Sequence, residues 1–287
     1  MTLHDAHCHL HFASLSPFLE DALATARRAG LAAAVVNGTS QADWPQVTEF
    51  CWRHPWAVPA YGIHPWHAAG RTDSWEKELT GLLEAAPAAS VGEIGLDLWI
   101  EGHNLTGQTA LFLRQLAIAR EHRRPATIHC VRAWEPLRQC LQKHAAPDAG
   151  FLLHAYSGPE NLIPFFAERG AYFSFSPSFL AARRQSRREA FRLMPRDRIL
   201  IETDAPDLGP PPELNPHPLT DSATGKPLNH PANLILSLQS LAAVLDLDEA
   251  SAARLTTENW RRLFTRQVFD NVPGKAGNAE AGASGGK

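Results

Sequence analysis

The sequence lacks the features that mark several classes of protein. No apolar run in its 287 residues approaches the roughly 20 residues needed to cross a bilayer. The chain begins with neither a basic nor an apolar segment, so we expect no secretory signal. Only four cysteines occur, without paired spacing, which favours the reducing cytoplasm over a disulfide framework. The net charge of −3 excludes a strongly basic coat for non-specific nucleic-acid binding.

Signatures of two kinds of enzyme are also missing. No Gly-x-Gly-x-x-Gly or Walker A pattern follows a predicted strand, so nucleotide-cofactor chemistry has no support. Ser157 lies outside the Gly-x-Ser-x-Gly elbow of serine hydrolases. We interpret Ser157-Gly158-Pro159-Glu160 as a capping box that begins a helix, and we keep Ser157 as a candidate substrate contact. Histidine, by contrast, is abundant: the chain has 14, against 3 tyrosines.

Short apolar segments alternate with longer amphipathic ones along most of the chain. The pattern predicts eight strands: Leu3–His9, Leu31–Asn37, Ala57–Ile63, Ser90–Asp97, Ala126–Cys130, Phe151–Ala155, Ala171–Ser176 and Ile199–Asp204. Helical periodicity lies between them, for example over Phe18–Ala29 and Leu105–Arg120. Eight such units in about 265 residues match an α/β (β/α)8 TIM barrel, with a doubly wound sheet as the alternative. We therefore predict one barrel domain over residues 1–270 and a disordered Gly/Ala/Ser-rich tail over 271–287.

Polar residues lie at the ends of six of the predicted strands, namely strands 1, 3, 4, 5, 6 and 8. They are His7, His9, His64, Glu93, His129, His154 and Asp204. The carboxyl ends of barrel strands form the rim that carries active sites, so we expect these side chains to meet there. Strands 2 and 7 are left without such a residue.

His7 and His9 lie on one face of the first strand, because alternate residues of a strand point the same way. A lone His-x-His pair is a weak signal. Four imidazoles and two carboxylates converging on one rim would, however, be costly without a cation. Six ligands exceed the four that one zinc takes, which favours two divalent ions, zinc, magnesium or manganese. The expected chemistry is hydrolysis by a metal-activated water.

These residues also stand in motifs that resemble the TatD family, metal-dependent hydrolases often called TatD deoxyribonucleases, within the amidohydrolase-like TIM barrels. The resemblance runs from about residue 3 to residue 265, and the ordered set is far more specific than His-x-His alone. The matching segments are Asp5-Ala6-His7-Cys8-His9-Leu10, Gly62-Ile63-His64-Pro65, Val91-Gly92-Glu93-Ile94-Gly95-Leu96-Asp97, Ile128-His129, His154-Ala155-Tyr156-Ser157-Gly158 and Leu200-Ile201-Glu202-Thr203-Asp204-Ala205-Pro206.

The resemblance implies a role for each residue of the set. His7, His9 and Asp204 would bind one metal, and Glu93 would bridge it to a second metal bound by His129 and His154. Asp204 would also orient or deprotonate the attacking water. His64 is not an expected ligand; it would contact the scissile phosphate or the leaving group, or else support the site through hydrogen bonds. The implied catalytic residues are therefore Asp204, Glu93 and His64.

The chain departs from the family at the substrate rim. The family's Arg-Asn-Glu-Pro segment is Leu228-Asn229-His230-Pro231 here, so a bidentate phosphate donor is missing. Arg183 and Arg184, after the seventh strand, are candidate backbone contacts, and Trp66 is a candidate for stacking on a base. Solvated surface residues and ordinary loop packing are the alternatives for these three. The departures leave the metal set complete and put the substrate in doubt.

We expect a phosphodiesterase, specifically a 3′→5′ exodeoxyribonuclease acting on nucleic-acid ends or a small phosphodiester, with no membrane and no obligate protein partner. The alternative is an amide, ester or lactone hydrolase of the amidohydrolase type, or an aminoacyl-tRNA deacylase, with the same metals. Some such relatives bridge their metals with a carboxylated lysine, whereas the fourth strand here offers Glu93 and no lysine nearby. A non-catalytic metal-bound module is a third reading, which the complete ligand set disfavours.

Overall fold

Eight parallel strands form the centre of the molecule, and each pairs with the next along the chain. A computed structural model describes residues 1–265. The strands are β1 (Leu3–Cys8), β2 (Leu31–Asn37), β3 (Ala57–Tyr61), β4 (Ser90–Asp97), β5 (Ala126–Val131), β6 (Phe151–Leu153), β7 (Ala171–Phe175) and β8 (Ile199–Ile201). All eight predicted strands are present, and β2 and β4 have the predicted bounds. The sequential order confirms the TIM barrel and excludes the doubly wound sheet.

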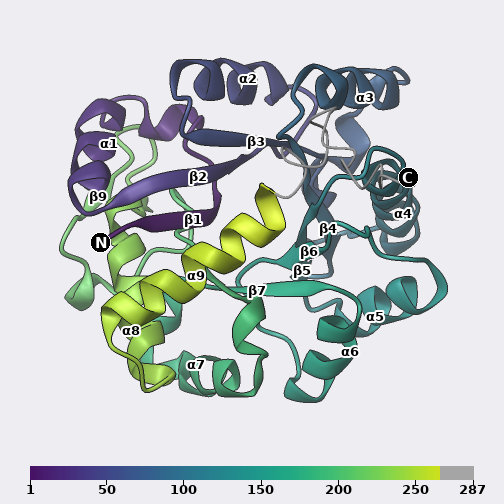
Figure 1. Cartoon of the computed structure of the whole chain (residues 1–287). Helices are drawn as coiled ribbons and strands as arrows, with labels where there is room; N and C mark the ends of the chain where they lie inside the picture. The colour runs from purple at the N-terminus through teal and green to yellow at the C-terminus, as the bar shows by residue number, and fades with distance from the viewer. Residues whose placement is uncertain (266–287) are drawn as a thin grey trace, which may run out of the picture.

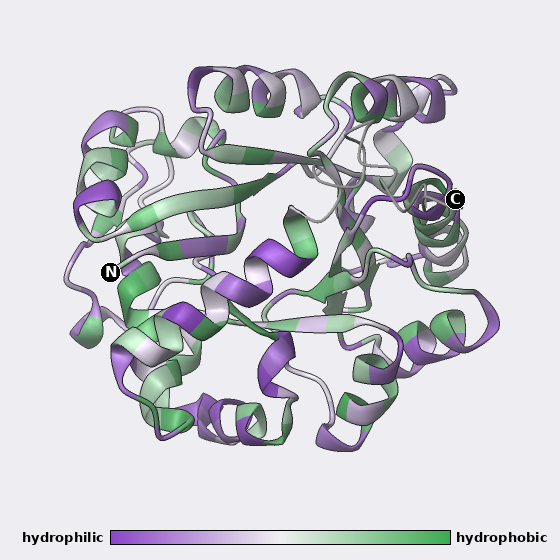
Figure 2. Cartoon of the chain, viewed as in Figure 1, coloured by the Kyte–Doolittle hydropathy of each residue, from purple (hydrophilic) through white to green (hydrophobic). Residues whose placement is uncertain are grey.

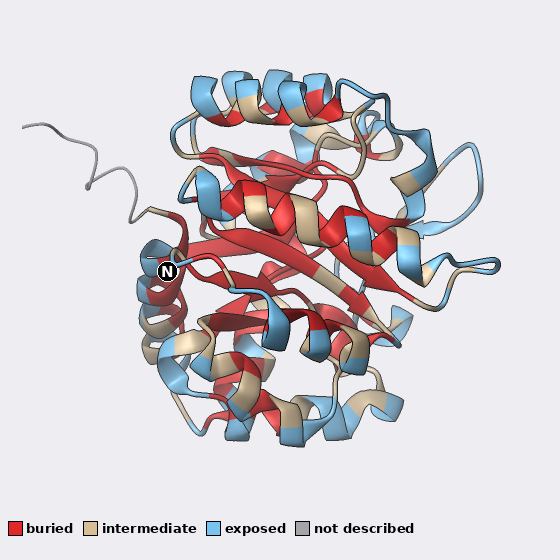
Figure 3. Cartoon of the chain, turned by 90° about the vertical axis from the view of Figure 1, so that its right-hand side faces the viewer, coloured by how far each residue is buried: buried red, intermediate tan, exposed pale blue. Residues whose placement is uncertain are grey.

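Helices surround the strands and cover their outer face (Figure 1). They are α1 (Leu19–Arg28), α2 (Trp44–Arg53), α3 (Trp75–Ala85), α4 (Leu105–Glu121), α5 (Trp134–Lys143), α6 (Ile163–Glu168), α7 (Gln185–Glu189), α8 (Leu234–Val244) and α9 (Glu249–Phe264). Figure 2 shows hydrophilic and hydrophobic residues mixed along these helices, and Figure 3 shows buried strands beneath helices that expose one side. Amphipathic periodicity explains both, because each helix buries one stripe against the sheet.

The end of the barrel at the start of the strands is closed by the last helix. A cluster of buried apolar residues from the strands, including Ala6, Leu152 and Leu200, packs there against Trp260 and Phe264 of α9. The indole N–H of Trp260 donates to the carbonyl of Asp5 (3.2 Å), so the helix is bonded to β1 as well as packed on it. Figure 1 shows α9 running across this end of the barrel.

The opposite end closes through backbone hydrogen bonds between the first strand and the segment after the last one. The amide of Asp204 donates to the carbonyl of His7 (2.9 Å), and the amide of His9 donates to the carbonyl of Ala205 (2.7 Å). These bonds fix the two segments that carry His7, His9 and Asp204 side by side. The site at the rim is therefore tied to the closure of the barrel.

One local feature differs from the sequence pattern, and a second has no counterpart among the predicted strands. The capping box predicted at Ser157 is wrong: Pro159 keeps the chain extended, and a 3-10 turn begins after it at Glu160 with no side-chain cap, before α6. The proline-rich segment after β8 contains an antiparallel hairpin, β9 (Leu219–Thr220) with β10 (Pro227–Leu228).

The remaining predictions about organisation are tested only in part. Within residues 1–265, no helix has the length and apolarity that a bilayer crossing requires. The tail predicted over 271–287 lies outside the described residues. The domain boundary at residue 270 and a cytoplasmic location stay predictions.

Candidate metal centre and substrate cavity

The rim brings His7, His9 and Asp204 together in a compact triangle of potential ligand atoms. The two Nε2 atoms of His7 and His9 are 3.1 Å apart, and Oδ1 of Asp204 lies 3.2 Å from the first and 3.3 Å from the second. All three side chains are buried. The predicted common face of His7 and His9 is therefore confirmed.

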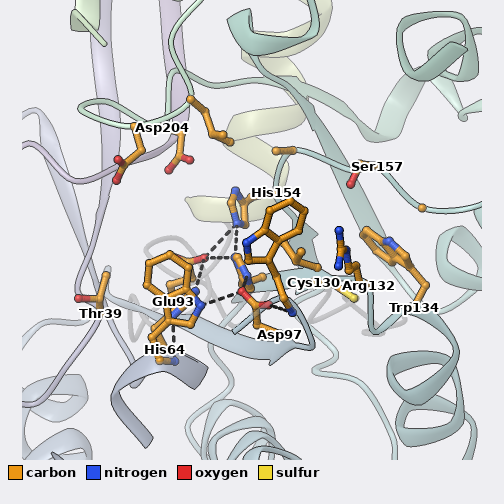
Figure 4. Close-up of a pocket in the computed structure, with 18 of the residues that line it drawn as sticks. Thr39, His64, Glu93, Asp97, Cys130, Arg132, Trp134, His154, Ser157 and Asp204 are labelled. Atoms are coloured by element: carbon orange, nitrogen blue, oxygen red, sulfur yellow. Dashed lines mark hydrogen bonds and ion pairs between the residues drawn. The ribbon is translucent and has the colours of Figure 1, made fainter. Parts of the chain in front are cut away.

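A second triangle lies beside the first and contains Glu93. Nδ1 of His129 and Nε2 of His154 are 3.2 Å apart, and each is 3.0 Å from Oε1 of Glu93. Figure 4 shows His154 and Glu93 facing each other. The other carboxylate oxygen of Glu93 lies 3.5 Å from His7 Nε2 and 3.4 Å from His9 Nε2. Glu93 thus stands between the two triangles, with one oxygen directed toward each.

The sides of these triangles have the length expected for ligands of one cation. A tetrahedral site with bonds of about 2.0–2.1 Å separates neighbouring ligand atoms by about 3.3 Å. Groups of three histidine and carboxylate atoms in this cluster lie within 4.8 Å of one another and could hold a metal. All six residues predicted as ligands therefore converge, in an arrangement that fits divalent cations.

Backbone geometry sets the positions of two of these side chains. Gly95 pairs with His129 in the β4–β5 register and has φ +151°, and a Cβ at this position would overlap the His129 carbonyl oxygen. Only glycine lets β4 approach β5 so closely at this point. Asp204 adopts φ 58°, a left-handed conformation that aspartate tolerates better than most residues. Such strain is typical of functional sites.

Charge in the cluster is strongly coupled. Burial alone would lower the pKa of His9, but its hydrogen bonds to Asp204 and Glu93 outweigh burial and hold that pKa well above its usual value. Burial also acts to lower the pKa of His154, and the charges of Glu93 and Glu202 reverse the effect. Burial would raise the pKa of Glu93, yet the surrounding histidines, His154 foremost, hold it well below its usual range. A divalent cation would take over the neutralising role of these protons.

Each triangle is supported from behind by groups that the sequence analysis did not select. Nε2 of His129 lies 3.0 Å from Oδ2 of Asp97, and Nδ1 of His154 lies 3.7 Å from Oε1 of Glu202. Nδ1 of His9 is 2.7 Å from the carbonyl oxygen of Asn37. Such partners fix the orientation of imidazole ligands.

Strand alternation could have revealed two of these supports. Asp97 shares a face with Glu93, and Glu202 shares one with Asp204. Strands 2 and 7, predicted to carry none of the candidate ligands, support the site instead: Asn37 ends β2 and its carbonyl oxygen contacts His9, and the hydroxyl of Ser174 in β7 donates to Glu202. Backbone carbonyls and hydroxyl donors leave no charge pattern in a sequence, which is why these two strands were missed.

His64 lies next to the second triangle, with Nε2 3.7 Å from Oε1 of Glu93 and its ring 4.3 Å from that of His129. Its Nδ1 accepts a hydrogen bond from the amide of Trp66 (3.2 Å). Burial, followed by the charge of His129, lowers the pKa of His64 well below its usual value. We conclude that His64 is a neutral imidazole with its proton on Nε2, facing the cluster.

A cavity of about 1250 Å³ opens above the two triangles. It is lined by Glu93, His64 and Asp204, and also by all the residues predicted to contact substrate: Trp66, Ser157, Arg183 and Arg184. Arg187, which the sequence analysis did not select, lines it too. Arg184 donates to the hydroxyl of Ser178 (2.7 Å). The indole N–H of Trp66 donates to Oδ2 of Asp97 (2.8 Å), and 58% of this side chain is exposed.

The segment that replaces the family's arginine supports the loop after β8. Leu228 and Asn229 are buried, and the side-chain amide of Asn229 donates to the carbonyl of Thr203 (2.7 Å), next to Asp204. None of the residues from Leu228 to Pro231 is among those that line the cavity in the described part of the chain. A phosphate in the cavity would therefore be bound by cationic groups outside this segment.

Comparison with known proteins identifies the family. Residues 4–265 match the family described as TatD related DNase. The chain belongs to the TatD family of metal-dependent hydrolases. It is 28% identical to the metal-dependent hydrolase YabD of Bacillus subtilis over 91% of this chain and 98% of that protein. It is 30% identical to the 3'-5' ssDNA/RNA exonuclease TatD of Erwinia tasmaniensis over 83% and 90% of the two chains. The crystal structure of the TatD homologue YjjV from Escherichia coli has a TM-score of 0.82, with 26% identity, over 92% of this chain and 98% of that one.

Proposed function

We propose that this protein is a phosphodiesterase that removes nucleotides from the 3′ end of a nucleic-acid strand. The observation that supports it best is the pair of ligand triangles joined through Glu93, at the floor of a cavity with arginines in its wall. The name of the Erwinia relative, a 3'-5' ssDNA/RNA exonuclease, indicates the substrate class and the direction.

The residues present fit two divalent cations. His7, His9 and Asp204 would hold one cation, His129 and His154 would hold the other, and Glu93 would contact both. The ring nitrogens of His9 and His129 that face away from the cluster contact the carbonyl oxygen of Asn37 (2.7 Å) and Oδ2 of Asp97 (3.0 Å), as is usual where the opposite ring nitrogen binds an ion. Such cations supply an activated water near neutral pH and stabilise the entering and leaving oxygens of a phosphoryl group. Zinc, magnesium or manganese would each serve, with the histidines favouring zinc or manganese.

Side chains of the protein would supply the remaining functions, which are to orient the water and to bind the phosphates. Asp204 is ionised, since its hydrogen bonds to His7 and His9 outweigh burial and lower its pKa, so the carboxylate can orient a water and accept its proton. His64 presents the N–H of a neutral ring and can donate to a phosphoryl oxygen. Arg183, Arg184 and Arg187 line the cavity and would bind backbone phosphates of the strand.

A nuclease assay with labelled strands tests this function. Single-stranded DNA or RNA carrying a 3′ label should release the label as mononucleotide at once, whereas a 5′ label should pass through a ladder of shortened products. Glu93→Gln should lower kcat/KM at least about 1000-fold, because it removes the shared carboxylate and several kcal/mol of transition-state stabilisation.

Glu84→Gln is the matched control, since Glu84 is an exposed residue of α3 away from the cavity, and it should retain full activity. Intact nucleic acid, combined with cleavage of an amide, ester or aminoacyl-tRNA panel, would show that the enzyme is a hydrolase of the other amidohydrolase type. Release of the label from the 5′ end first would contradict the proposed direction.

A further inference from the structure

One wall of the cavity carries an exposed tryptophan covered on one face by an arginine. Trp99 follows β4, Arg132 follows β5, and the guanidinium carbon of Arg132 lies 4.0 Å from the centroid of the Trp99 ring. Both residues line the cavity, and Figure 4 shows Arg132 in it. Trp99 remains 63% exposed although Arg132 covers part of it, so a large part of the indole is free for another planar group.

The stacked pair is attached to the candidate metal centre. Oδ1 of Asp97 accepts a hydrogen bond from the Trp99 amide (2.6 Å), while Oδ2 of the same carboxylate lies 3.0 Å from His129. Arg132 is three residues beyond His129 and has φ 56°, a left-handed conformation that is uncommon for arginine. Strained backbone conformations of this kind cluster at ligand-binding and active sites.

The guanidinium of Arg132 is available for a ligand. Within residues 1–265, no carboxylate forms an ion pair with Arg132. Its N–H groups form a planar fork that suits phosphate, and stacking on Trp99 leaves the edge of this fork free. A base on the tryptophan and a phosphate on the arginine together make up one nucleotide.

We propose that Trp99 and Arg132 form a nucleotide subsite beside the metal centre, which stacks a base of the strand on Trp99 and binds a neighbouring phosphate through Arg132. This proposal rests on the proposed function. It assigns the substrate a single-stranded end, because a base that stacks on a protein ring cannot also remain paired inside a duplex. The arginines after β7 line the same cavity and would bind the strand beyond this subsite.

A kinetic comparison tests the subsite in the active enzyme. For each variant we would measure kcat/KM on a short single-stranded oligonucleotide and on bis(p-nitrophenyl) phosphate, a phosphodiester without a base. Trp99→Ala should lower the ratio of kcat/KM for the oligonucleotide to kcat/KM for bis(p-nitrophenyl) phosphate roughly tenfold, mainly by raising the KM for the oligonucleotide. Trp99→Phe should restore most of the ratio. Trp52→Ala is the control, because Trp52 is 81% exposed on α2 and does not line the cavity. An unchanged ratio for Trp99→Ala would overturn the proposal.

A binding measurement keeps the subsite testable even if the proposed hydrolysis fails. Fluorescence anisotropy of a labelled oligonucleotide with chelator-treated protein should show affinity several-fold weaker for Trp99→Ala and for Arg132→Gln than for wild type. Arg132→Lys should fall between, because it keeps the charge and loses the planar fork. Arg120→Ala, at an exposed position of α4 outside the cavity, should bind as wild type does. Equal binding by all variants would refute the subsite, whereas absent hydrolysis with the expected binding pattern would refute only the proposed reaction.

Discussion

The two ends of the barrel are built from the same eight strands but bury side chains of opposite character. At the closed end, Ala6, Leu200 and Trp260 pack in an apolar cluster, and polar groups there such as the Trp260 indole are paired. At the rim, four histidines and two carboxylates are buried together. Burying so many ionisable groups costs free energy unless a cation neutralises them. The closed end stabilises the fold, whereas the buried ionisable groups of the rim lower the stability of the fold and form the candidate metal centre.

The division runs within single strands. In β1, Ala6 belongs to the cluster at the closed end, whereas His7 and the following His9 belong to the rim. In β8, Leu200 packs below and Asp204 follows above. Substitutions a few residues apart should therefore affect different properties of the protein, and three predictions test this separation.

The largest effect should come from truncating the residue that closes the barrel. Trp260 is buried, and Trp260→Ala should lower the free energy of unfolding by about 3–5 kcal/mol, because it removes a large apolar side chain and the hydrogen bond to Asp5. Denaturant titration measures this loss, and assays at low temperature measure activity per folded molecule. A large fall in the activity of the folded fraction would contradict the separation of the two ends.

A smaller effect, visible only at acidic pH, should arise from His4 at the closed end. Its Nδ1 lies 3.1 Å from the Thr257 hydroxyl and its ring 4.8 Å from Trp260, and burial, helped by Arg261, lowers its pKa to about 4. The unfolded chain therefore binds a proton that the folded chain rejects between about pH 6.5 and pH 4, so His4 makes stability fall as pH falls through this window.

His4→Gln should reduce this loss of stability by about 2 kcal/mol between about pH 7.5 and pH 5. The measurement is the difference between wild-type and variant unfolding free energies at the two pH values, which cancels the contribution of the rim histidines. Parallel pH profiles for the two proteins would show that His4 is not the group responsible.

The smallest effect should come from the support behind a rim histidine. Glu202 is fully buried and lies 3.7 Å from Nδ1 of His154. Glu202→Gln keeps the shape of the side chain and removes its charge, so we expect metal affinity to fall about tenfold, the low end for such partners. Competition with a chromophoric chelator measures the affinity, with Glu84→Gln as the control. Unchanged affinity would mean that the barrel alone positions His154.

Much of this architecture could be predicted because each strand carries its own evidence. The apolar segment Leu31–Asn37 gave β2 its bounds, and the polar residues at the ends of six predicted strands pointed to the rim without any knowledge of distance. His129 and His154 are 25 residues apart in sequence, yet parallel strands must end at the same edge, so their meeting followed from topology.

What could not be predicted depends on pairs that no strand pattern relates. Trp99 and Arg132 come from two different loops, and their stacking depends on backbone conformations, including the left-handed one at Arg132. The carbonyl of Asn37 supports His9 through an atom that every residue possesses. Ser157 looked like a helix cap because the pattern fits, but Pro159 fixed the chain in an extended conformation. Local sequence describes elements, and it says little about side chains that meet across loops.

The position of α9 has a consequence for the order of synthesis. This helix seals β1 through Trp260, and it contacts β8 through Asn259, whose side-chain amide donates to the carbonyl of Ile199 (2.9 Å). The site needs His7 from the beginning of the chain and Asp204 from more than two-thirds of the way along it. During synthesis the ligand set therefore cannot be complete before residue 204 has been added to the chain. The contacts of α9 with β1 and β8 can form only later still, after residue 260 has been added.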